Sequence, residues 1–245
     1  MSADVSIVIA AHNTRVFLEQ SLAAIGNRHE VTVVDTGSTD RSQALVRERF
    51  PRVRLLELDT NAGYGRALNA GIASSSGELL VLMNGDAWPL PGSLERLVEA
   101  AESEPGAGIL GPRLLNPDGT LQPSVRGFPT LWRLGTEYLF LRWLAPRSRA
   151  LNAFYGSGFD HRSRREAEFL VGAVLLVRRQ LVVGHAARLD DHELVPWHAR
   201  GQVPAGPDDE PVARKLRVQL ADLPPDGIEL THGQAPLGAH PAGGA

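Results

Sequence analysis

Short apolar runs rich in β-branched residues alternate with helix-like segments over the first half of the chain. In each helix-like segment the apolar residues recur every three or four positions, which is the spacing of one helix face. The predicted strands are 5–10, 31–34, 53–57 and 78–83, and the predicted helices are 17–25, 39–50, 64–73 and 91–103. Repeated strand–helix alternation predicts an α/β fold, with a mostly parallel central sheet and helices on both faces.

The middle of the chain has a different pattern. A turn at 116–119 separates two short extended segments, and 131–144 is an amphipathic stretch with several aromatic residues. Residues 169–177 form a further apolar run, which predicts one buried strand ended by two arginines.

From residue 180 onward, proline and histidine become frequent, and no regular period persists outside 212–223. Little apolar surface is left to bury beyond about residue 201, so we expect loose order there. The sequence therefore divides into three parts, which are 1–112, 113–179 and a divergent tail, 180–245.

Composition narrows the class of protein. The chain has 245 residues, 43% of them hydrophobic, and a net charge of −3 at pH 7. This is typical of a globular protein and disfavours general nucleic-acid binding. The absence of cysteine excludes disulfides, thiolate metal sites and a cysteine nucleophile. Neither a basic targeting segment nor an apolar run of about 20 residues is visible, so we expect a cytoplasmic protein.

Candidate chemistry begins at the end of the second predicted strand, where Asp35 stands just before a glycine and a serine. In an open parallel sheet, ligands bind beyond the carboxyl ends of the strands. A carboxylate at that edge can accept hydrogen bonds from a base or a ribose. An equally good alternative is that Asp35 only caps the helix that follows, for which Ser38 and Thr39 are further candidates.

The fourth predicted strand ends at Asn84, Gly85 and Asp86. Mg²⁺ and Mn²⁺ prefer such oxygen ligands, and nucleotide phosphates can complete their coordination shell. Taken alone, three residues of this kind are better explained by an ordinary polar turn.

Two glycines precede the third predicted helix in segment 61–66, Asn-Ala-Gly-Tyr-Gly-Arg. Backbone N–H groups could approach a phosphate there, although the segment is neither a Walker A loop nor Gly-x-Gly-x-x-Gly. A tight strand-to-helix turn is the alternative.

As a set, these segments resemble the family 2 glycosyltransferases, which have the GT-A fold. The matches follow the family's order between residues 5 and 179, and they are strongest in the N-terminal half. The matching segments are Ala-Ala-His-Asn at 10–13, Val-Val-Asp-Thr-Gly-Ser-Thr-Asp at 33–40, Asn-Ala-Gly-Tyr-Gly at 61–65, Asn-Ala-Gly-Ile at 69–72, Gly-Glu-Leu-Leu-Val-Leu-Met-Asn-Gly-Asp at 77–86, Gly-Pro-Arg-Leu-Leu-Asn-Pro-Asp-Gly-Thr-Leu-Gln at 111–122 and Val-Gly-Ala-Val-Leu-Leu-Val-Arg-Arg at 171–179. The last two are most similar to the rhamnosyltransferase-like branch, which builds bacterial cell-surface polysaccharides.

The resemblance implies that residues 1–112 bind a nucleotide-sugar, either a UDP- or a dTDP-sugar, and that 113–179 form the acceptor side of the same domain. Asp35 would bind the pyrimidine base. Asp86 would hold a divalent cation, Mg²⁺ or Mn²⁺, on the diphosphate. The other residues implied in nucleotide binding are Ala11, Asn13, Gly63, Arg66, Asn84 and Gly85.

The family's reaction transfers the sugar with inversion to the hydroxyl of a saccharide or lipid-linked acceptor, which a base deprotonates. After residue 179, the family's Gly-Gly-Phe-Asp-Glu segment and acidic base motif are not recognisable. Asp190 and Asp191 are the candidates for the base, although a solvated loop is the favoured alternative for them. We therefore expect poor transfer, and a catalytically impaired nucleotide-binding protein is the alternative function. A nucleotidyltransferase is a remote alternative, because 10–15 lacks that class's glycine-rich loop.

The stretch 131–144 has two interpretations. It could lie on a membrane surface, at the inner face of the membrane, or contact a lipid-linked acceptor. Packing of its aromatic residues in the core or in a homodimer is the favoured interpretation.

Overall fold

The computed structural model describes residues 4–128, 130–139, 148, 165–186, 217–220 and 230–232. The strands of the central sheet are β1 (Val5–Ala11), β2 (Glu30–Thr36), β3 (Arg54–Leu58), β4 (Leu79–Asn84), β6 (Ala107–Gly111), β11 (Val174–Arg178) and β12 (Arg217–Leu220). The shorter strands are β5 (Ala87–Pro89), β7 (Leu114–Leu115), β8 (Leu121–Gln122), β9 (Val125–Arg126), β10 (Phe169–Leu170) and β13 (Leu230–His232). The helices are α1 (Arg15–Ile25), α2 (Ser42–Arg49), α3 (Tyr64–Ala73), α4 (Ser93–Ser103), α5 (Leu131–Tyr138) and α7 (Arg179–Ala186).

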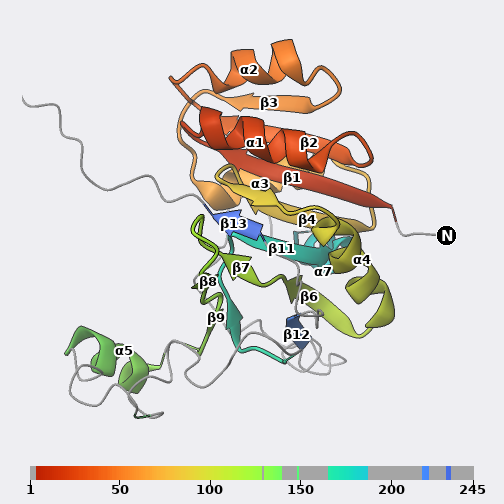
Figure 1. The fold of residues 1–245 in the computed structure, drawn as a ribbon. Helices are drawn as coiled ribbons and strands as arrows, with labels where there is room; N and C mark the ends of the chain where they lie inside the picture. The colour runs from red at the N-terminus through yellow and green to blue at the C-terminus, as the bar shows by residue number, and fades with distance from the viewer. Residues whose placement is uncertain are drawn as a thin grey trace, which may run out of the picture.

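The central sheet is mostly parallel, as predicted. Its strand order is β12-β6-β11-β4-β1-β2-β3 (Figure 1). The pairs β4–β1, β1–β2, β2–β3 and β6–β12 are parallel, whereas β11 runs antiparallel to both of its neighbours. The carboxyl ends of β4, β1, β2 and β3 therefore lie along one edge of the sheet.

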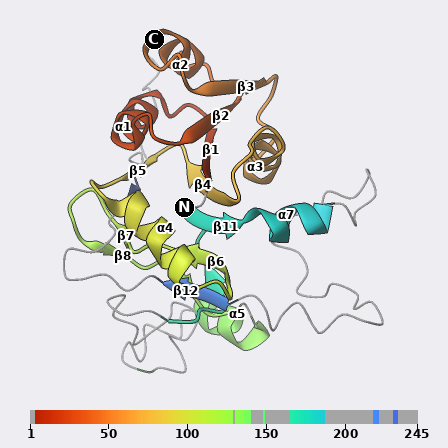
Figure 2. The same cartoon turned by 90° about the vertical axis from the view of Figure 1, so that its right-hand side faces the viewer.

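Helices cover both faces of this sheet. Along β1, Val5, Ile7 and Ile9 pack in one apolar cluster with residues of α1, α2 and α4. The intervening Val8 packs in a second cluster with residues of α3. Figure 2 shows the same arrangement, with α1 and α4 on one side of the strands and α3 on the other. Burial on two faces explains why the predicted strands are apolar at nearly every position instead of alternating.

Two boundaries differ from the sequence prediction. Neither Ser38 nor Thr39 caps α2, which begins only at Ser42. Instead, Asp40 Oδ1 accepts hydrogen bonds from the backbone amide of Ser42 at 3.0 Å and from its hydroxyl at 2.5 Å. The predicted single strand 169–177 is divided into β10 and β11, because β10 pairs with β9 outside the central sheet and only β11 belongs to that sheet.

Part of the tail also has regular structure. The helix α7 follows β11 directly, where the sequence showed no helical period. Further on, β12 pairs with β6, and β13 pairs with β5 and β7. The rest of the tail, including Asp190 and Asp191, lies outside the described residues, so its expected loose order stays a prediction.

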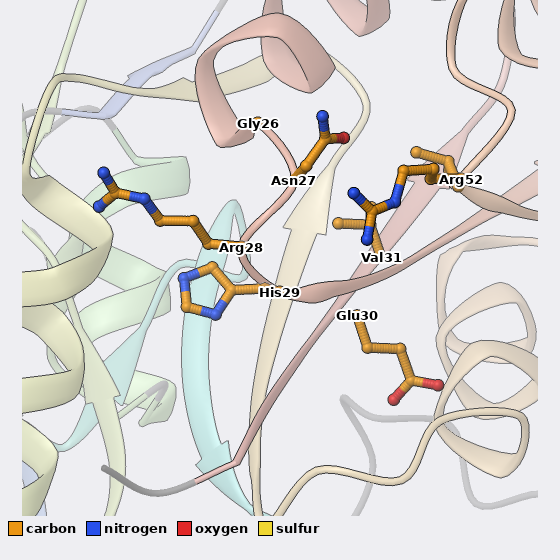
Figure 3. A pocket seen from close by; sticks show the side chains of 8 residues that line it. Gly26, Asn27, Arg28, His29, Glu30, Val31 and Arg52 are labelled. Carbon is orange, nitrogen blue, oxygen red and sulfur yellow. The ribbon is translucent and has the colours of Figure 1, made fainter.

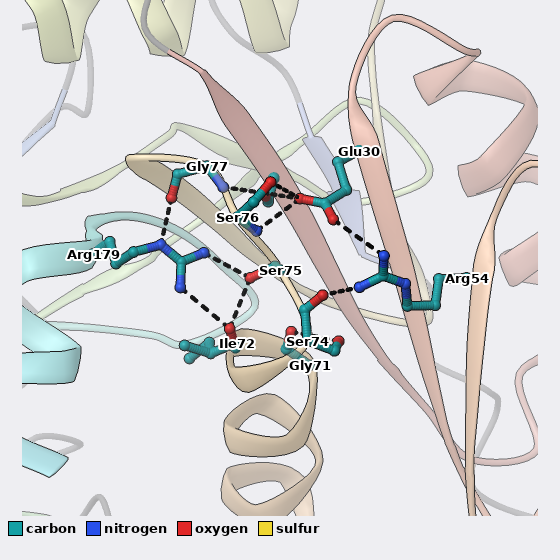
Figure 4. A network of polar contacts seen from close by, with 10 residues as sticks. Glu30, Arg54, Gly71, Ile72, Ser74, Ser75, Ser76, Gly77 and Arg179 are labelled. Atoms are coloured by element: carbon teal, nitrogen blue, oxygen red, sulfur yellow. Dashed lines mark hydrogen bonds and ion pairs between the residues drawn. The ribbon is translucent and has the colours of Figure 1, made fainter. Parts of the chain in front are cut away.

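A polar network fixes the opposite edge of the sheet, where β2 begins (Figure 4). Glu30 Oε2 accepts hydrogen bonds from the Ser6 hydroxyl at 2.5 Å and from the Ser76 amide at 2.8 Å, and its other carboxylate oxygen faces Arg54 at 3.7 Å. Burial alone would raise the pKa of Glu30, but these hydrogen bonds outweigh it and hold the pKa below its usual value.

The guanidinium of Arg179, which directly follows β11, completes this network. It donates hydrogen bonds to the carbonyl of Gly77 at 2.6 Å, to that of Ile72 at 3.3 Å and to the Ser75 hydroxyl at 2.8 Å. A cation at carbonyls near the end of α3 offsets the negative end of the helix dipole. The connection from α3 to β4 is thereby held in one conformation.

Close approach between α3 and β1 depends on Gly71. A Cβ atom there would lie 2.2 Å from Cγ1 of Val8 and 3.1 Å from Cγ2 of Val34. Val8 is fully buried, and its β-branched side chain has little freedom to move aside. The sheet and the helix can therefore pack this closely only when position 71 lacks a side chain.

We expect Gly71→Ala to destabilise the protein by about 1–3 kcal/mol through overpacking. This loss exceeds the gain of about 0.5–1 kcal/mol that alanine normally brings to a helix interior. Gly65→Ala in the same helix is the matched control, because a Cβ there meets no atom within 4 Å. Urea denaturation measures the free energy of unfolding of both variants. A Gly71→Ala variant more stable than the unaltered protein would contradict the packing argument.

Candidate active site

Residues that the sequence placed at the ends of three strands, β1, β2 and β4, meet at the carboxyl edge of the sheet. In the register of the strands, Ala10 on β1 lies opposite Asn84 on β4. The next residue, Ala11, lies opposite Asp35 on β2. The segments that the sequence marked separately are thus neighbours in space, where a ligand of an open α/β sheet is expected.

Asp35 is almost completely buried, with 1% of its surface exposed. Its Oδ2 accepts hydrogen bonds from the Ser38 amide at 3.0 Å and from Gln43 Nε2 at 2.7 Å. Its Oδ1 is buried and has no hydrogen-bond partner among the described residues. Since the amide of Ser42, the first residue of α2, is bound by Asp40 and not by Asp35, the alternative of Asp35 as a helix cap is wrong.

The loops after β1 and β2 are bound to each other. Asn13 has a left-handed backbone conformation (φ 54°), and its side-chain oxygen accepts a hydrogen bond from the Thr39 amide at 2.8 Å. The backbone amide of Asn13 donates a hydrogen bond to the Ser38 hydroxyl at 2.9 Å, and His12 Nδ1 donates one to the Thr36 carbonyl at 2.8 Å. Asn13 therefore shapes the floor of the candidate site by joining two loops.

Asp40 makes a second connection between these loops. Its Oδ2 accepts a hydrogen bond from the amide of Arg15, at the start of α1, at 2.8 Å. Burial would raise the pKa of Asp40, but the hydrogen bonds from Ser42 and Arg15 outweigh it and lower the pKa. The sequence analysis assigned no role to Asp40, although it closes the matched segment 33–40.

The end of β4 packs closely against β1. The amide of Gly85 donates a hydrogen bond to the Ala10 carbonyl at 2.8 Å. A Cβ atom on Gly85 would lie 2.5 Å from Thr14 Oγ1 and 3.1 Å from that carbonyl oxygen. A side chain at position 85 would therefore force these atoms to shift, and glycine avoids this. The residues on either side of Gly85, Asn84 and Asp86, are half-buried and lie at the edge of the candidate site.

Tyr64 connects three of the matched segments and was missed by the sequence analysis. Its hydroxyl donates a hydrogen bond to the Gly172 carbonyl at 2.6 Å. Burial of the phenol and the nearby charge of Asp86 both raise its pKa, so the hydroxyl stays protonated and remains a donor. The available signal was an aromatic residue between two glycines at the start of a helix.

The two residues that the sequence predicted for nucleotide binding near the start of α3, Gly63 and Arg66, have different positions in the structure. Gly63, with φ 83°, is the last residue before the helix. Arg66 is exposed and lines a hollow of about 410 Å³ with Glu57 and Asp59, at the carboxyl end of β3. The structure therefore places Arg66 beside the outer strand and Tyr64 beside Asp86.

The residues at this edge suit a cation that arrives with a nucleotide. Among the described residues, no group of three or more histidine, aspartate or glutamate side chains could enclose a metal ion. Asp86 can offer a carboxylate and Asn84 an amide oxygen. Mg²⁺ is commonly held in this way, by one or two carboxylates together with substrate phosphates and water.

A second hollow, of about 320 Å³, lies at the opposite edge of the sheet (Figure 3). Its lining includes Arg28, His29 and Arg52, close to the starts of β2 and β3. Since Asp35 and Asp86 lie at the far ends of the strands, this hollow is not part of the candidate site.

Comparison with known proteins identifies the family. The model of glycosyl transferase family 2 matches residues 6–180, which include every strand-end segment described above. The chain belongs to glycosyl transferase family 2. The predicted family is thus confirmed, and the nucleotidyltransferase alternative has no support.

Individual relatives agree with this assignment. An N-acetylglucosaminyl-diphospho-decaprenol L-rhamnosyltransferase of Mycobacterium tuberculosis is 35% identical over 188 residues, which cover 71% of this chain and 61% of that protein. The succinoglycan biosynthesis protein ExoO of Rhizobium meliloti is 40% identical over 105 residues, covering 41% of this chain and 30% of that one. The chain thus spans less than two thirds of the length of these relatives.

A solved structure supports the GT-A-like fold. The crystal structure of S. aureus TarS 1–349 in complex with UDP-GlcNAc has a TM-score of 0.54 and 16% sequence identity, covering 95% of this chain and 59% of that chain. At that identity the likeness concerns the fold. In the part of the chain that the structure describes, none of the helices has the length and apolar character needed to cross a bilayer.

The Tyr64 contact predicts a measurable loss of stability. Tyr64→Phe removes the hydroxyl and leaves the Gly172 carbonyl without this donor, which should cost about 0.5–1.5 kcal/mol. Urea denaturation with an unchanged m-value would show the loss. Unchanged stability would mean that the contact between α3 and the segment before β11 contributes nothing to the fold.

Proposed function

We propose that this chain binds a UDP- or dTDP-sugar at the carboxyl edge of β1, β2 and β4 and transfers the sugar with inversion to an acceptor hydroxyl. The observation that carries the proposal is the buried, unpartnered Oδ1 of Asp35. Leaving a buried acceptor unsatisfied costs about 1–3 kcal/mol, so the site needs a hydrogen-bond donor from a ligand.

The base chemistry follows from that acceptor. Uracil and thymine both carry an N–H donor at ring position N3, whereas N3 of cytosine is an acceptor. The other oxygen of Asp35 is already held by Ser38 and Gln43, so the carboxylate has a fixed orientation. A fixed acceptor selects a uracil or thymine base and opposes cytosine.

We expect UDP to bind more tightly than CDP by on the order of 1–3 kcal/mol, because CDP would bury two facing acceptors. Asp35→Asn should reduce this preference, since an amide offers a donor as well as an acceptor. Calorimetry with both nucleotides measures the difference, and Arg28→Ala at the opposite edge is the control. Equal affinities of the unaltered protein for UDP and CDP would remove Asp35 from the base pocket.

A divalent cation, Mg²⁺ or Mn²⁺, is proposed to bind the donor diphosphate beside Asp86. When bound, it supplies positive charge that stabilises the departing diphosphate. The carboxylate of Asp86 would orient the ion, and Tyr64, whose pKa is raised by burial and by the charge of Asp86, would keep a neutral hydroxyl nearby.

Asp86→Asn should abolish the increase in UDP affinity that Mn²⁺ produces and leave the fold intact. The matched control is Asp59→Asn, which removes a carboxylate just beyond the end of β3, the outer strand at the same edge of the sheet. Calorimetry with and without Mn²⁺, together with circular dichroism, measures both effects. A folded Asp86→Asn variant with the full Mn²⁺ effect would contradict the metal assignment.

The acceptor is proposed to be a lipid-linked saccharide, as the name of the mycobacterial relative indicates for that protein. Asp190 and Asp191 are the proposed candidates for the base that deprotonates its hydroxyl. A transfer assay with UDP- and dTDP-sugars tests the reaction. Nucleotide binding without transfer by this chain would support the alternative of an impaired, nucleotide-binding relative.

A further inference from the structure

Helix α5 presents apolar side chains to solvent. Leu131 is 91% exposed, Trp132 61% and Leu139, just past the helix end, 69%. At about 100° per residue, these three positions lie within an arc of roughly 100° on the helix. Thr136, outside this arc, is buried, with 2% of its surface exposed. We call Leu131, Trp132 and Leu139 the α5 apolar face.

The α5 apolar face is attached to the body of the protein by an ion pair. Arg133 lies 2.5 Å from Glu168, which directly precedes β10, and also donates a hydrogen bond to the Phe128 carbonyl at 2.9 Å. Glu168 in turn accepts a hydrogen bond from the Phe128 amide at 2.7 Å. The hydrogen bond from Arg133 lowers the pKa of Glu168, so the pair stays charged near neutral pH. The start of α5 therefore has a defined position.

The charge around α5 is opposite in sign to that of the rest of the chain. Segment 126–149 contains five arginines and one glutamate, a net charge of +4. The other positions hold 20 basic and 27 acidic residues. Three of the five arginines lie outside the described residues, so this charge is a property of the sequence. An arginine-rich segment that carries an exposed apolar helix face, in a chain with net negative charge, is typical of contact with an anionic lipid surface.

We propose that the α5 apolar face inserts into the interface of an anionic membrane. Exposed leucine and tryptophan side chains enter the boundary between headgroups and acyl chains, and the arginines attract anionic lipid. A second copy of the chain is a poorer occupant, because a two-fold interface would bring the same +4 segment against itself. This replaces our initial preference for core or dimer packing of the same residues.

The arrangement of the fold agrees with this surface. In Figure 1, β1 runs away from the labelled N-terminus, so its carboxyl end lies on the left, and α5 lies at the lower left. Both views place α5 at the end of the molecule opposite α2 (Figures 1 and 2). α5 therefore lies at one end of the described part of the protein. The inference does not rest on the proposed transferase activity.

The test is sedimentation of the full chain with vesicles of phosphatidylcholine alone or with one quarter phosphatidylglycerol. We expect binding to the anionic vesicles, weaker binding to the neutral ones, and a decrease with added salt. Replacing all three residues of the α5 apolar face by serine should reduce partitioning roughly tenfold or more. Val16→Ser is the matched control, because Val16 is 76% exposed on α1 and should leave partitioning unchanged.

Circular dichroism and UDP affinity establish that each variant is folded. Vesicle binding by the triple-serine variant equal to that of the unaltered chain would overturn the proposal, as would no binding of the unaltered chain to anionic vesicles. A concentration-dependent dimer in analytical ultracentrifugation that the three serines abolish, without any lipid binding, would assign the surface to a second copy instead.

Discussion

The hydrogen bond from Gly85 to the Ala10 carbonyl joins the ends of the two central strands, and the candidate site depends on it. No side chain fits at position 85, so the turn after β4 lies directly against β1. The amide and carboxylate of the Asn-Gly-Asp turn are thereby brought to the same edge as Asp35. The central sheet, buried on both faces, gives this edge a rigid support.

The contacts at the two ends of the strands differ in kind. At the amino edge, Glu30 and Arg179 have several hydrogen bonds each, which hold the connection between α3 and β4. At the carboxyl edge, Asp35 is buried with one oxygen lacking a partner among the described residues. A buried acceptor without a partner is unfavourable for stability. Other buried polar atoms without a partner, such as Thr32 Oγ1 and Ser93 Oγ, occur elsewhere among the described residues, so the proposed role of Asp35 in recognition depends on its position at the carboxyl edge.

The first four strands are joined to the later part of the chain mainly by the antiparallel pairing of β11 with β4, and a few long-range hydrogen bonds add to it. Tyr64 at the start of α3 reaches Gly172, just before β11. The amide of Asn84 donates to the Ala173 carbonyl at 2.9 Å, on the same short segment. These two hydrogen bonds hold the segment before β11 against the start of α3 and the end of β4.

The pattern of apolar residues by itself predicted the four parallel strands of the first half and the helices that follow them, because strands buried on both faces leave a continuous apolar signal. The order of the strands in the sheet, and the strands β5 and β6, came only from the structure. It also placed Asp35 and Asp86 at strand ends. Only the tertiary structure decided that Asp40, and not Ser38 or Thr39, holds the start of α2, and that Tyr64 contacts Gly172. The physical reason is that these hydrogen bonds join loops whose conformations depend on one another, and local propensity carries no information about a partner supplied by another part of the fold.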